Sequence, residues 1–255
     1  MKVGIVGLGA MGSAMAINLY KANALTAVWN RTSSRTAPVT EATGVHQAHD
    51  LPSLAEKCEV ILLSVSADED VLSVIDTLLP GCAAGSTIID TSTVSTTTAR
   101  QAEKILKGKK IHFLDAPVSG GVEGARNATL SMMVGGDKKV LEQVRPVLEA
   151  ISSQIVHMGP VGNGQATKAV NQIMAAGINQ AVTEALAFGQ AMELPMEKVI
   201  DVVSGGAAGN WFLAHRGNSM VAGDYKPGFR IALHDKDLGI CENMAKEEGR
   251  ETSRN

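Results

Sequence analysis

The feature that most constrains the fold of this sequence is a glycine-rich turn directly after a short β-branched run. The run covers Val3–Val6, and the turn reads Gly7-Leu8-Gly9-Ala10-Met11-Gly12, which matches the pattern G-x-G-x-x-G. Such glycines permit a tight turn, close approach of the backbone to a pyrophosphate, and close packing of a helix on a strand. The N-terminus of the following helix adds unpaired N–H groups and a positive dipole end. The motif predicts a βαβ unit that binds a dinucleotide at these six residues.

The residues that follow the turn alternate between short apolar runs and stretches with helical spacing of apolar positions. Strands are expected at residues 2–6, 25–29, 60–64, 87–90, 111–114, 130–134 and 154–157. Helices are expected at residues 11–21, 70–79, 96–107 and 138–150. This alternation is typical of a parallel sheet covered by helices on both faces. We therefore predict an α/β fold with a Rossmann-type doubly wound sheet over residues 1–160.

The composition changes after residue 157, where four glycines and prolines form a loop at residues 159–164. A long helix is expected over residues 166–192, which contain no proline. From Met196 onward the sequence indicates helices broken near Gly205, Gly209 and Gly228. Residues 161–255 are accordingly predicted to form an all-helical domain that begins with the long helix.

Charge and cysteine content exclude several classes of protein. The net charge of -3 with scattered Lys and Arg argues against a nucleic-acid partner. The 3 cysteines form no C-x-x-C pair, which argues against a disulfide framework or a zinc site and favours a reducing cytoplasm. No segment resembles a signal peptide or a membrane helix. We therefore expect neither a membrane nor a nucleic acid as partner.

The end of the second predicted strand bears on the choice of dinucleotide. A carboxylate at this position would bind a ribose 2′-hydroxyl and repel a 2′-phosphate. The sequence here is Trp29-Asn30-Arg31-Thr32, without a carboxylate. Arg31 offers a permanently charged fork suited to phosphate, while Asn30 and Thr32 add neutral donors. This favours NADP over NAD; the alternative is that Arg31 is an ordinary solvated loop residue.

Lys168 is the candidate proton donor for a hydride transfer to a carbonyl, which leaves a developing alkoxide to be protonated. It lies one turn into the long helix, three residues before Asn171 and four before Gln172, so all three can share one helix face. Partial burial would lower the pKa of a lysine toward the range in which it gives up a proton. The alternative is a solvated lysine at a helix start.

Two segments follow predicted strands at the edge where doubly wound sheets bind ligands. Residues 115–121 read DAPVSGG, and their Ser119-Gly120-Gly121 turn can aim a hydroxyl and backbone N–H groups at one carboxylate. A plain loop is the alternative. Thr93, after the strand that ends at Asp90, is a candidate contact for the nicotinamide end of a cofactor or a cap for the next helix.

Rival chemistries find less support. His46, His49 and Asp50 lack a further ligand nearby, so we expect no metal site. No G-x-S-x-G elbow supports a hydrolase. Lys236 and Asp237 by themselves indicate only a surface ion pair of little energetic weight.

Four ordered motifs together resemble the β-hydroxyacid dehydrogenase family, which includes 3-hydroxyisobutyrate dehydrogenase, tartronate semialdehyde reductase, and glyoxylate and succinic semialdehyde reductases. They are the glycine turn, DAPVSGG at 115–121, GNGQATKAVNQ at 162–172 and KPGFRIALHDKDL at 226–238. The resemblance covers essentially the whole chain. It implies a hydride transfer between NADP(H) and a small β-hydroxy acid or the matching semialdehyde.

The resemblance also implies roles for single residues. Lys168 is implied as the general acid/base, with Asn171 orienting the substrate; many members have Asn where this chain has Gln172. The implied substrate-binding residues are Ser119, Gly120, Gly121, Phe229 and Asp237. We expect Val65, Thr93 and Lys236 among the cofactor-binding residues.

Several further expectations follow from the same family. Its members run on for more helix than this chain, so the helical domain is expected to be C-terminally short. Exposed apolar helix faces favour a homo-oligomer, a dimer or tetramer. A catalytically silent NADP-binding protein is the alternative function. A 6-phosphogluconate dehydrogenase-like decarboxylase is disfavoured because Asn171 stands where those enzymes have His.

Overall fold

The computed structural model describes residues 1–225 and 230–250. Internal contacts divide the chain into two compact units, Met1–Ala169 and Val170–Asn255. The division falls inside one continuous helix, α8, which covers Asn163–Ala191. The sequence placed the domain boundary in the loop before this helix.

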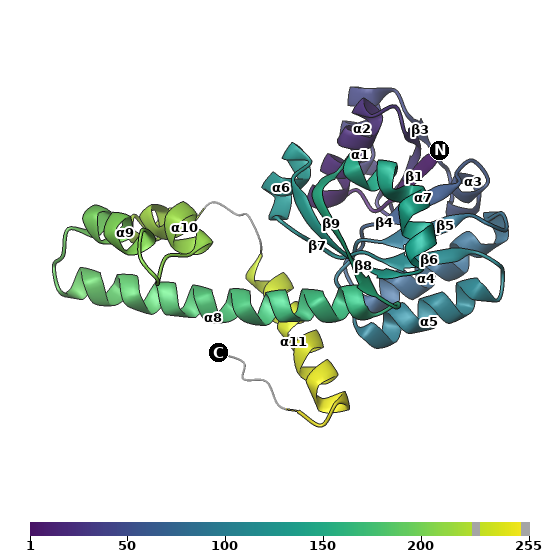
Figure 1. The fold of residues 1–255 in the computed structure, drawn as a ribbon. Helices are drawn as coiled ribbons and strands as arrows, with labels where there is room; N and C mark the ends of the chain where they lie inside the picture. The colour runs from purple at the N-terminus through teal and green to yellow at the C-terminus, as the bar shows by residue number, and fades with distance from the viewer. Residues whose placement is uncertain (226–229, 251–255) are drawn as a thin grey trace. The chain divides into compact units, whose positions relative to one another are not determined.

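The first unit alternates strands with helices (Figure 1). Its strands are β1 Val3–Val6, β2 Leu25–Trp29, β3 His46–Gln47, β4 Val60–Leu63, β5 Thr87–Asp90, β6 His112–Asp115, β7 Val118–Ser119, β8 Leu130–Gly136 and β9 Ser152–Gly159. Its helices are α1 Ala10–Lys21, α2 Ala37–Thr43, α3 Leu51–Ala55, α4 Asp68–Leu78, α5 Thr96–Lys107, α6 Gly121–Asn127 and α7 Lys138–Glu149, with 3-10 turns η1 Ser33–Arg35 and η2 Leu79–Gly81. The short elements β3, β7, α2, α3 and α6 were not predicted.

The strands form a nine-stranded sheet in the order β3-β2-β1-β4-β5-β6-β8-β7, with β9 beside β8. From β3 to β6 all neighbours pair in parallel. Because the chain leaves β1 toward β2 on one side and later returns to β4 on the other, the strand order reverses at this point. Ligands of doubly wound sheets bind outside the carboxyl ends of the strands at such a switch point. The predicted Rossmann-type fold is confirmed.

The sheet departs from a purely parallel pattern at β8, which runs antiparallel to both β6 and β7. The two short strands pair with β8 in one unbroken register, and the Pro117 carbonyl between them accepts a hydrogen bond from the Met133 N–H at 3.1 Å. β6 and β7 are thus one extended segment, interrupted at Ala116-Pro117 because proline has no N–H to donate. This places the Ser119-Gly120-Gly121 turn at the far end of that segment.

Helices cover both faces of the sheet, and alternate strand residues point to opposite sides. One core packs strand residues such as Ile5 and Leu62 against α1, α6 and α7. The other packs residues such as Ile61 and Ile88 against α3, α4 and α5. The central strands read as continuous apolar runs because both of their faces are buried.

The second unit contains the remainder of α8 together with α9 Met196–Ser204, α10 Trp211–Val221 and α11 Ile231–Glu247. The predicted breaks near Gly205 and Gly209 separate α9 from α10, and Asn210 caps α10 by accepting a hydrogen bond from the Leu213 N–H at 3.0 Å. The break near Gly228 lies outside the described residues. Within residues 1–225 and 230–250 no helix is long and apolar enough to cross a membrane.

Candidate active site

The glycine turn lies between β1 and α1. Gly7 has a φ of +94°, and a Cβ on it would lie 2.2 Å from the Ser64 carbonyl oxygen. A Cβ on Gly12 would lie 1.9 Å from the Gly7 carbonyl oxygen, so helix and turn pack backbone against backbone. A Cβ on Gly9 would meet no described atom within 4 Å. The turn is therefore closed on the protein side and open at Gly9, where a pyrophosphate would approach.

The other residues of the turn offer main-chain groups rather than side chains. Leu8 lies in the core and Met11 packs against it, while Ala10 is exposed in the first turn of α1. The Asn30 Oδ1 accepts a hydrogen bond from the Leu8 N–H at 2.8 Å, and the Asn30 Nδ2 donates to the Thr32 carbonyl at 2.9 Å. Asn30 thus braces the turn against the end of β2, a role that the sequence did not predict.

Arg31 projects from the end of β2 with 80% of its side chain exposed. Its Nη1 lies 2.8 Å from the Asp70 Oδ1 at the start of α4. The contact joins residues that are 39 positions apart in the chain. The predicted phosphate-binding arginine is therefore already paired with a carboxylate in this structure.

The first turn of α8 is anchored on the end of β6 by a buried carboxylate. Asp115 Oδ1 accepts a hydrogen bond from the Gly162 N–H at 2.9 Å, and Oδ2 accepts from the Gln165 N–H at 2.9 Å. These N–H groups at a helix start have no partner within the helix, so the carboxylate satisfies them. Gly164 allows the close approach, because a Cβ there would lie 2.6 Å from the Asp115 carbonyl oxygen.

Lys168 follows one turn later and is buried, with 7% of its surface exposed. Its Nζ donates a hydrogen bond to the Val118 carbonyl at 2.9 Å, next to Ser119. Gly120 and Gly121 then have φ values of +125° and +61°, and a Cβ on Gly121 would meet no described atom within 4 Å. The structure thus brings the lysine to the Ser119-Gly120-Gly121 turn, and the interpretation of Lys168 as a solvated residue is wrong.

Gln165 is a site residue that the sequence reasoning missed. It is 1% exposed, its Nε2 donates to the Ser92 carbonyl at 2.9 Å, and its Oε1 accepts from the Val94 N–H at 3.2 Å. The amide therefore holds the main chain on both sides of Thr93, one turn before Lys168. The cap of α5 is Ser95 rather than Thr93, which removes the capping alternative for that threonine.

The loop after β4 joins the same arrangement, because the Val65 N–H donates to the Ser92 Oγ at 3.0 Å. The three loops after β4, β5 and β6 are thus linked to one another or to the start of α8. No sequence signal pointed to Gln165, since a glutamine near a helix start is usually solvated. Only its side-chain hydrogen bonds to the loop after β5 show what it holds in place.

Two buried carboxylates lie side by side at this edge of the sheet, because Asp90 of β5 is in register with Asp115 of β6. Burial raises the pKa of Asp90 to about 7, although hydrogen bonds from Ser92 lower it. Burial likewise raises the pKa of Asp115 to about 6, against the lowering effect of the Gly162 and Gln165 N–H groups. Asp90 Oδ2 has no hydrogen-bond partner among the described residues. The edge therefore favours one negative charge over two.

In the second unit, a chain of polar contacts links Asn171, Gln172, Asp237 and Lys236. Asn171 Nδ2 donates to the Gln172 Oε1 at 2.8 Å, and Gln172 Nε2 donates to the Asp237 Oδ2 at 2.6 Å. Asp237 is 3% exposed, and its Oδ1 lies 3.0 Å from the Lys236 Nζ. Asp237 is therefore buried rather than part of a surface pair. Phe229, predicted at the substrate, lies outside the described residues.

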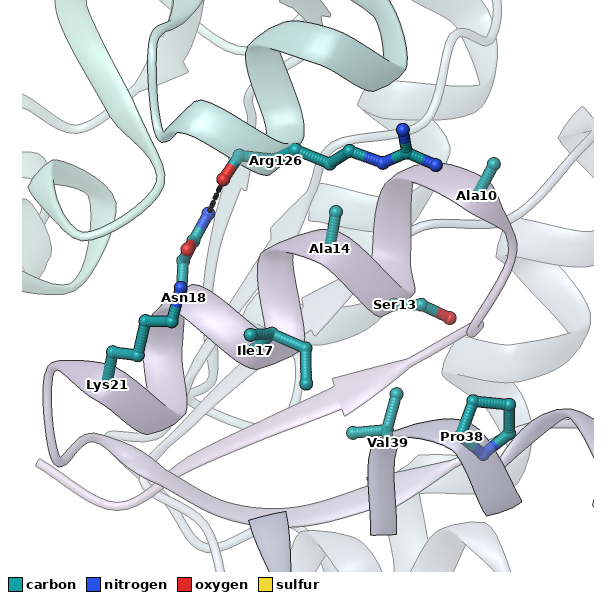
Figure 2. A pocket seen from close by; sticks show the side chains of 9 residues that line it. All are labelled: Ala10, Ser13, Ala14, Ile17, Asn18, Lys21, Pro38, Val39 and Arg126. Atoms are coloured by element: carbon teal, nitrogen blue, oxygen red, sulfur yellow. Dashed lines mark hydrogen bonds between the residues drawn. The ribbon is translucent and has the colours of Figure 1, made fainter. Parts of the chain in front are cut away.

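A groove of about 450 Å³ runs along the outer face of α1. Figure 2 shows Ala10, Ser13 and Ile17 along the helix, with the Arg126 side chain extending from α6 toward the Ala10 end. The Asn18 Nδ2 donates to the Ala125 carbonyl at 2.7 Å and to the Arg126 carbonyl at 3.2 Å. These bonds fix α6 on α1. Since α6 starts at Gly121, they also help to position the Ser119-Gly120-Gly121 turn.

The rival sites have structural explanations. Asp50 Oδ1 accepts from the Ser53 N–H at 2.8 Å and caps α3, and His49 Nε2 lies 3.0 Å from Asp50 Oδ2. Over the part of the chain that the structure describes, no group of three His, Cys, Asp or Glu side chains could hold a metal. Burial raises the pKa of the Cys58 thiol to about 12 and that of Cys82 to about 11, so neither is a ready nucleophile.

Two family models match the chain in sequence. Residues 2–159 match the NAD-binding domain of 6-phosphogluconate dehydrogenase, and residues 162–253 match a domain described as NAD-binding of NADP-dependent 3-hydroxyisobutyrate dehydrogenase. The chain belongs to the β-hydroxyacid dehydrogenase family. It is an NAD(P)-dependent hydroxyacid dehydrogenase of the 3-hydroxyisobutyrate dehydrogenase type.

Relatives across this family share about a third of their residues with the chain. An uncharacterized oxidoreductase of Shewanella frigidimarina is 38% identical over 251 residues, which is 97% of this chain and 86% of that protein. The 2-hydroxy-3-oxopropionate reductase of Escherichia coli is 36% identical over 249 residues, 96% of this chain and 85% of the reductase. A probable 3-hydroxyisobutyrate dehydrogenase of Mycobacterium tuberculosis is 34% identical over 256 residues, 97% of this chain and 86% of that protein.

Solved structures of the β-hydroxyacid dehydrogenase family share the fold. The structure of M. tuberculosis 3-hydroxyisobutyrate dehydrogenase with L-serine gives a TM-score of 0.89 at 32% identity and covers 99% of this chain and 89% of that chain. The structure of a 3-hydroxyisobutyrate dehydrogenase from Salmonella typhimurium gives a TM-score of 0.86 at 28% identity and covers 99% of this chain and 89% of that chain.

Proposed function

We propose that this dehydrogenase moves a hydride between NADP(H) and a small β-hydroxy acid or its semialdehyde, with Lys168 as general acid/base. The observation that carries the proposal is the burial of Lys168 with its Nζ 2.9 Å from the Val118 carbonyl, beside the Ser119-Gly120-Gly121 turn. A buried lysine on that turn is suited to a proton transfer next to a bound carboxylate.

The residues at the carboxyl edge fit a dinucleotide. Gly9 leaves open space over the start of α1, so that unpaired N–H groups of residues 9–12 can bind the pyrophosphate. Asn30, Arg31 and Thr32 would lie at the adenosine end, and Val65 and Thr93 at the nicotinamide end. When bound, the reduced nicotinamide supplies the hydride.

Lys168 handles the proton. In the reducing direction the carbonyl carbon of the substrate gains the hydride, and the carbonyl oxygen takes a proton from the Lys168 Nζ. In the oxidising direction the neutral lysine removes the hydroxyl proton as the carbon loses its hydride. The Val118 carbonyl holds the Nζ in place for both directions, which reduces the orientational freedom that the transition state has to restrict.

The substrate is small and carries a carboxylate. The Ser119 hydroxyl and the main-chain N–H groups of Gly120 and Gly121 are its proposed binding groups. From the second unit we propose Asn171, Phe229 and Asp237 at the substrate and Lys236 at the cofactor, on the strength of the family resemblance. The M. tuberculosis relative was solved with L-serine, a small acid with a β-hydroxyl group, which supports this substrate class.

NADP is preferred because the segment that ends β2, Trp29-Asn30-Arg31-Thr32, supplies an arginine for a 2′-phosphate and no carboxylate of its own for a 2′-hydroxyl. The model that matches residues 162–253 is described for an NADP-dependent enzyme, which supports the same preference. We infer that residues 1–160 form the cofactor domain and residues 161–255 the helical domain. Free Cys58, Cys82 and Cys241 are consistent with the inferred cytoplasmic location.

We also infer a homo-oligomer, a dimer or tetramer. Its support is the number of large apolar side chains that the second unit exposes, among them Phe188 at 67% and Val202 at 71%. Isolated soluble proteins rarely leave large contiguous apolar patches uncovered.

The test compares Lys168→Ala and Lys168→Arg with the parent. Consumption of NADPH and, in parallel, of NADH would be followed by the absorbance of the reduced nicotinamide across a panel of semialdehydes and glyoxylate. We expect kcat to fall by about 10²–10⁴-fold in both variants, since arginine keeps the charge but does not release the proton. Lys107→Ala, at the exposed end of α5, serves as the matched control and should retain full activity.

Stabilisation by NADP in a thermal shift assay should persist in every variant, which separates chemistry from folding and binding. Unchanged turnover in Lys168→Ala would remove the proposed role of the lysine. If the parent consumes neither NADPH nor NADH but is still stabilised by NADP, the chain is instead a catalytically silent NADP-binding protein.

A further inference from the structure

Arg31 projects from a loop whose main chain is fixed on both sides. Asn30 accepts from the Leu8 N–H at 2.8 Å and donates to the Thr32 carbonyl at 2.9 Å, so the loop is tied to the glycine turn. The guanidinium itself is 80% exposed and uses one nitrogen, Nη1, for its contact with Asp70. Since the loop is held and the side chain is accessible, the environment of the guanidinium determines what it can bind.

Asp70 provides that environment from a helix remote in the sequence. Its side chain is 26% exposed, and its Oδ1 lies 2.8 Å from the Arg31 Nη1. The two charges largely cancel at this distance. An anion that approaches Arg31 therefore meets a nearly neutral pair rather than a free cation, and it also meets the repulsion of the carboxylate.

The neighbouring acids of α4 differ from Asp70. Asp68 Oδ1 accepts hydrogen bonds from the Ser95 N–H at 2.9 Å and from the Thr98 hydroxyl at 2.6 Å, so it supports the start of α5. Glu69 is exposed to solvent. Asp70 is the acid of this helix turn that contacts the arginine at the dinucleotide-selecting position.

We propose that Asp70 competes with the cofactor 2′-phosphate for Arg31 and thereby sets how strongly the enzyme prefers NADP over NAD. The inference rests on the proposed function, in which Arg31 binds that phosphate. NADP must displace the carboxylate or share the guanidinium with it, whereas NAD carries an uncharged 2′-hydroxyl there and meets no such opposition. Asp70 thus reduces the preference for NADP over NAD that Arg31 creates.

The experiment measures the Kd of NADPH and of NADH by fluorescence titration of the substrate-free enzyme. Asp70→Asn keeps the size of the side chain and removes its charge. We expect the Kd of NADPH to fall about fivefold and that of NADH to change less than about twofold. The reason is that the variant removes one partly solvated negative charge next to the 2′-phosphate, which only NADPH carries. Glu69→Gln is the matched control, because it removes an equal charge from the next residue.

Arg31→Leu and the double variant Arg31→Leu/Asp70→Asn complete a mutant cycle. The gain from Asp70→Asn should vanish when Arg31 is absent. An unchanged or weaker affinity for NADPH in Asp70→Asn overturns the inference, as does an equal gain in Glu69→Gln, which would mean a general field effect. If Arg31→Leu leaves the ratio of the two affinities unchanged, the proposed role of Arg31 itself fails.

Discussion

The two units of the chain bury their apolar residues to very different extents. The first unit has two cores, one on each face of its sheet, in which side chains such as Leu62 are fully buried. Among the residues that the structure describes in the second unit, the hydrophobic cluster contains four buried side chains, Val182, Leu186, Ile200 and Leu213. Meanwhile Ile231 is 87% exposed and Trp211 is 52% exposed.

The difference follows from architecture. A sheet covered on both faces buries its strands completely, and its ladder hydrogen bonds are shielded from water. The helices α9 and α10 and the C-terminal part of α8 have no second layer within the described unit, so each can bury only one stripe of side chains. We therefore expect the first unit to contribute most of the free energy of unfolding of the single chain. The second unit should depend more on contacts that cover its exposed apolar side chains.

Matched core truncations test this comparison most strongly. Leu62→Ala should lower the free energy of unfolding of the first unit by about 3–5 kcal/mol, because the surrounding sheet cannot close the cavity. Leu213→Ala should cost about 2 kcal/mol, since its smaller core relaxes more easily. The 2 tryptophans report the units separately: Trp211→Phe leaves Trp29 of the first unit as probe, and Trp29→Phe leaves Trp211.

Urea unfolding of the two single-tryptophan variants, followed by fluorescence, gives the loss of unfolding free energy for each truncation. Equal losses in the two units would contradict the proposed difference in packing. A shift of the Trp211 signal by Leu62→Ala as large as that of the Trp29 signal would show that the units unfold together.

The buried Asp90 predicts a pH dependence confined to the first unit. Its pKa is raised from 3.8 to about 7 in the folded state, so between these values the folded chain holds a proton that the unfolded chain has released. Stability therefore falls as pH rises through this range, and the loss is complete above the folded pKa. Asp115, with a raised pKa of about 6, adds to the same trend.

Asp90→Asn keeps an oxygen for the Ser92 N–H and removes the charge. We expect the Tm of the Trp29 transition to rise by roughly 5 °C above pH 7 and to change little in acid, which flattens the pH profile. The control is Asp76→Asn at an exposed position of α4, which should change neither the Tm nor its dependence on pH. A profile as steep as that of the parent would mean that Asp90 is not the group responsible.

Surface substitutions in the second unit should have the smallest effect on folding. The double variant Phe188→Ser/Val202→Ser should change the free energy of unfolding by within about 0.5 kcal/mol per site, because both side chains are already exposed. If these residues cover one another in an oligomer, the mass measured by analytical ultracentrifugation should fall toward that of one chain. Tyr20→Ser, 43% exposed in the first unit, is the control and should leave the mass unchanged.

The mass of the parent decides the same question directly. A parent that sediments as a single chain at all concentrations refutes the inferred homo-oligomer. A parent oligomer that the double variant leaves intact shows that the interface lies elsewhere.

Local signals explain which elements could be predicted. β2, β5 and α5 were predicted with the bounds that the structure shows, because each is a short β-branched run or a capped periodic stretch between turn residues. The missed elements α2, α3 and α6 are helices of 7, 5 and 7 residues. Helices this short are not stable by themselves, so contacts with the rest of the protein decide them.

The glycine turn, the Rossmann-type alternation and the four motifs are therefore properties that the sequence alone determined, because turn chemistry and hydrophobic periodicity act between near neighbours. Only the tertiary structure decided that β8 runs antiparallel, that Asp115 anchors the start of α8, that Gln165 holds both sides of Thr93, and that Asp70 pairs with Arg31. Each of these contacts joins residues from separate elements. They depend on the order of strands in the sheet, because that order determines which strand-end loops become neighbours. No local sequence pattern encodes the order of the strands.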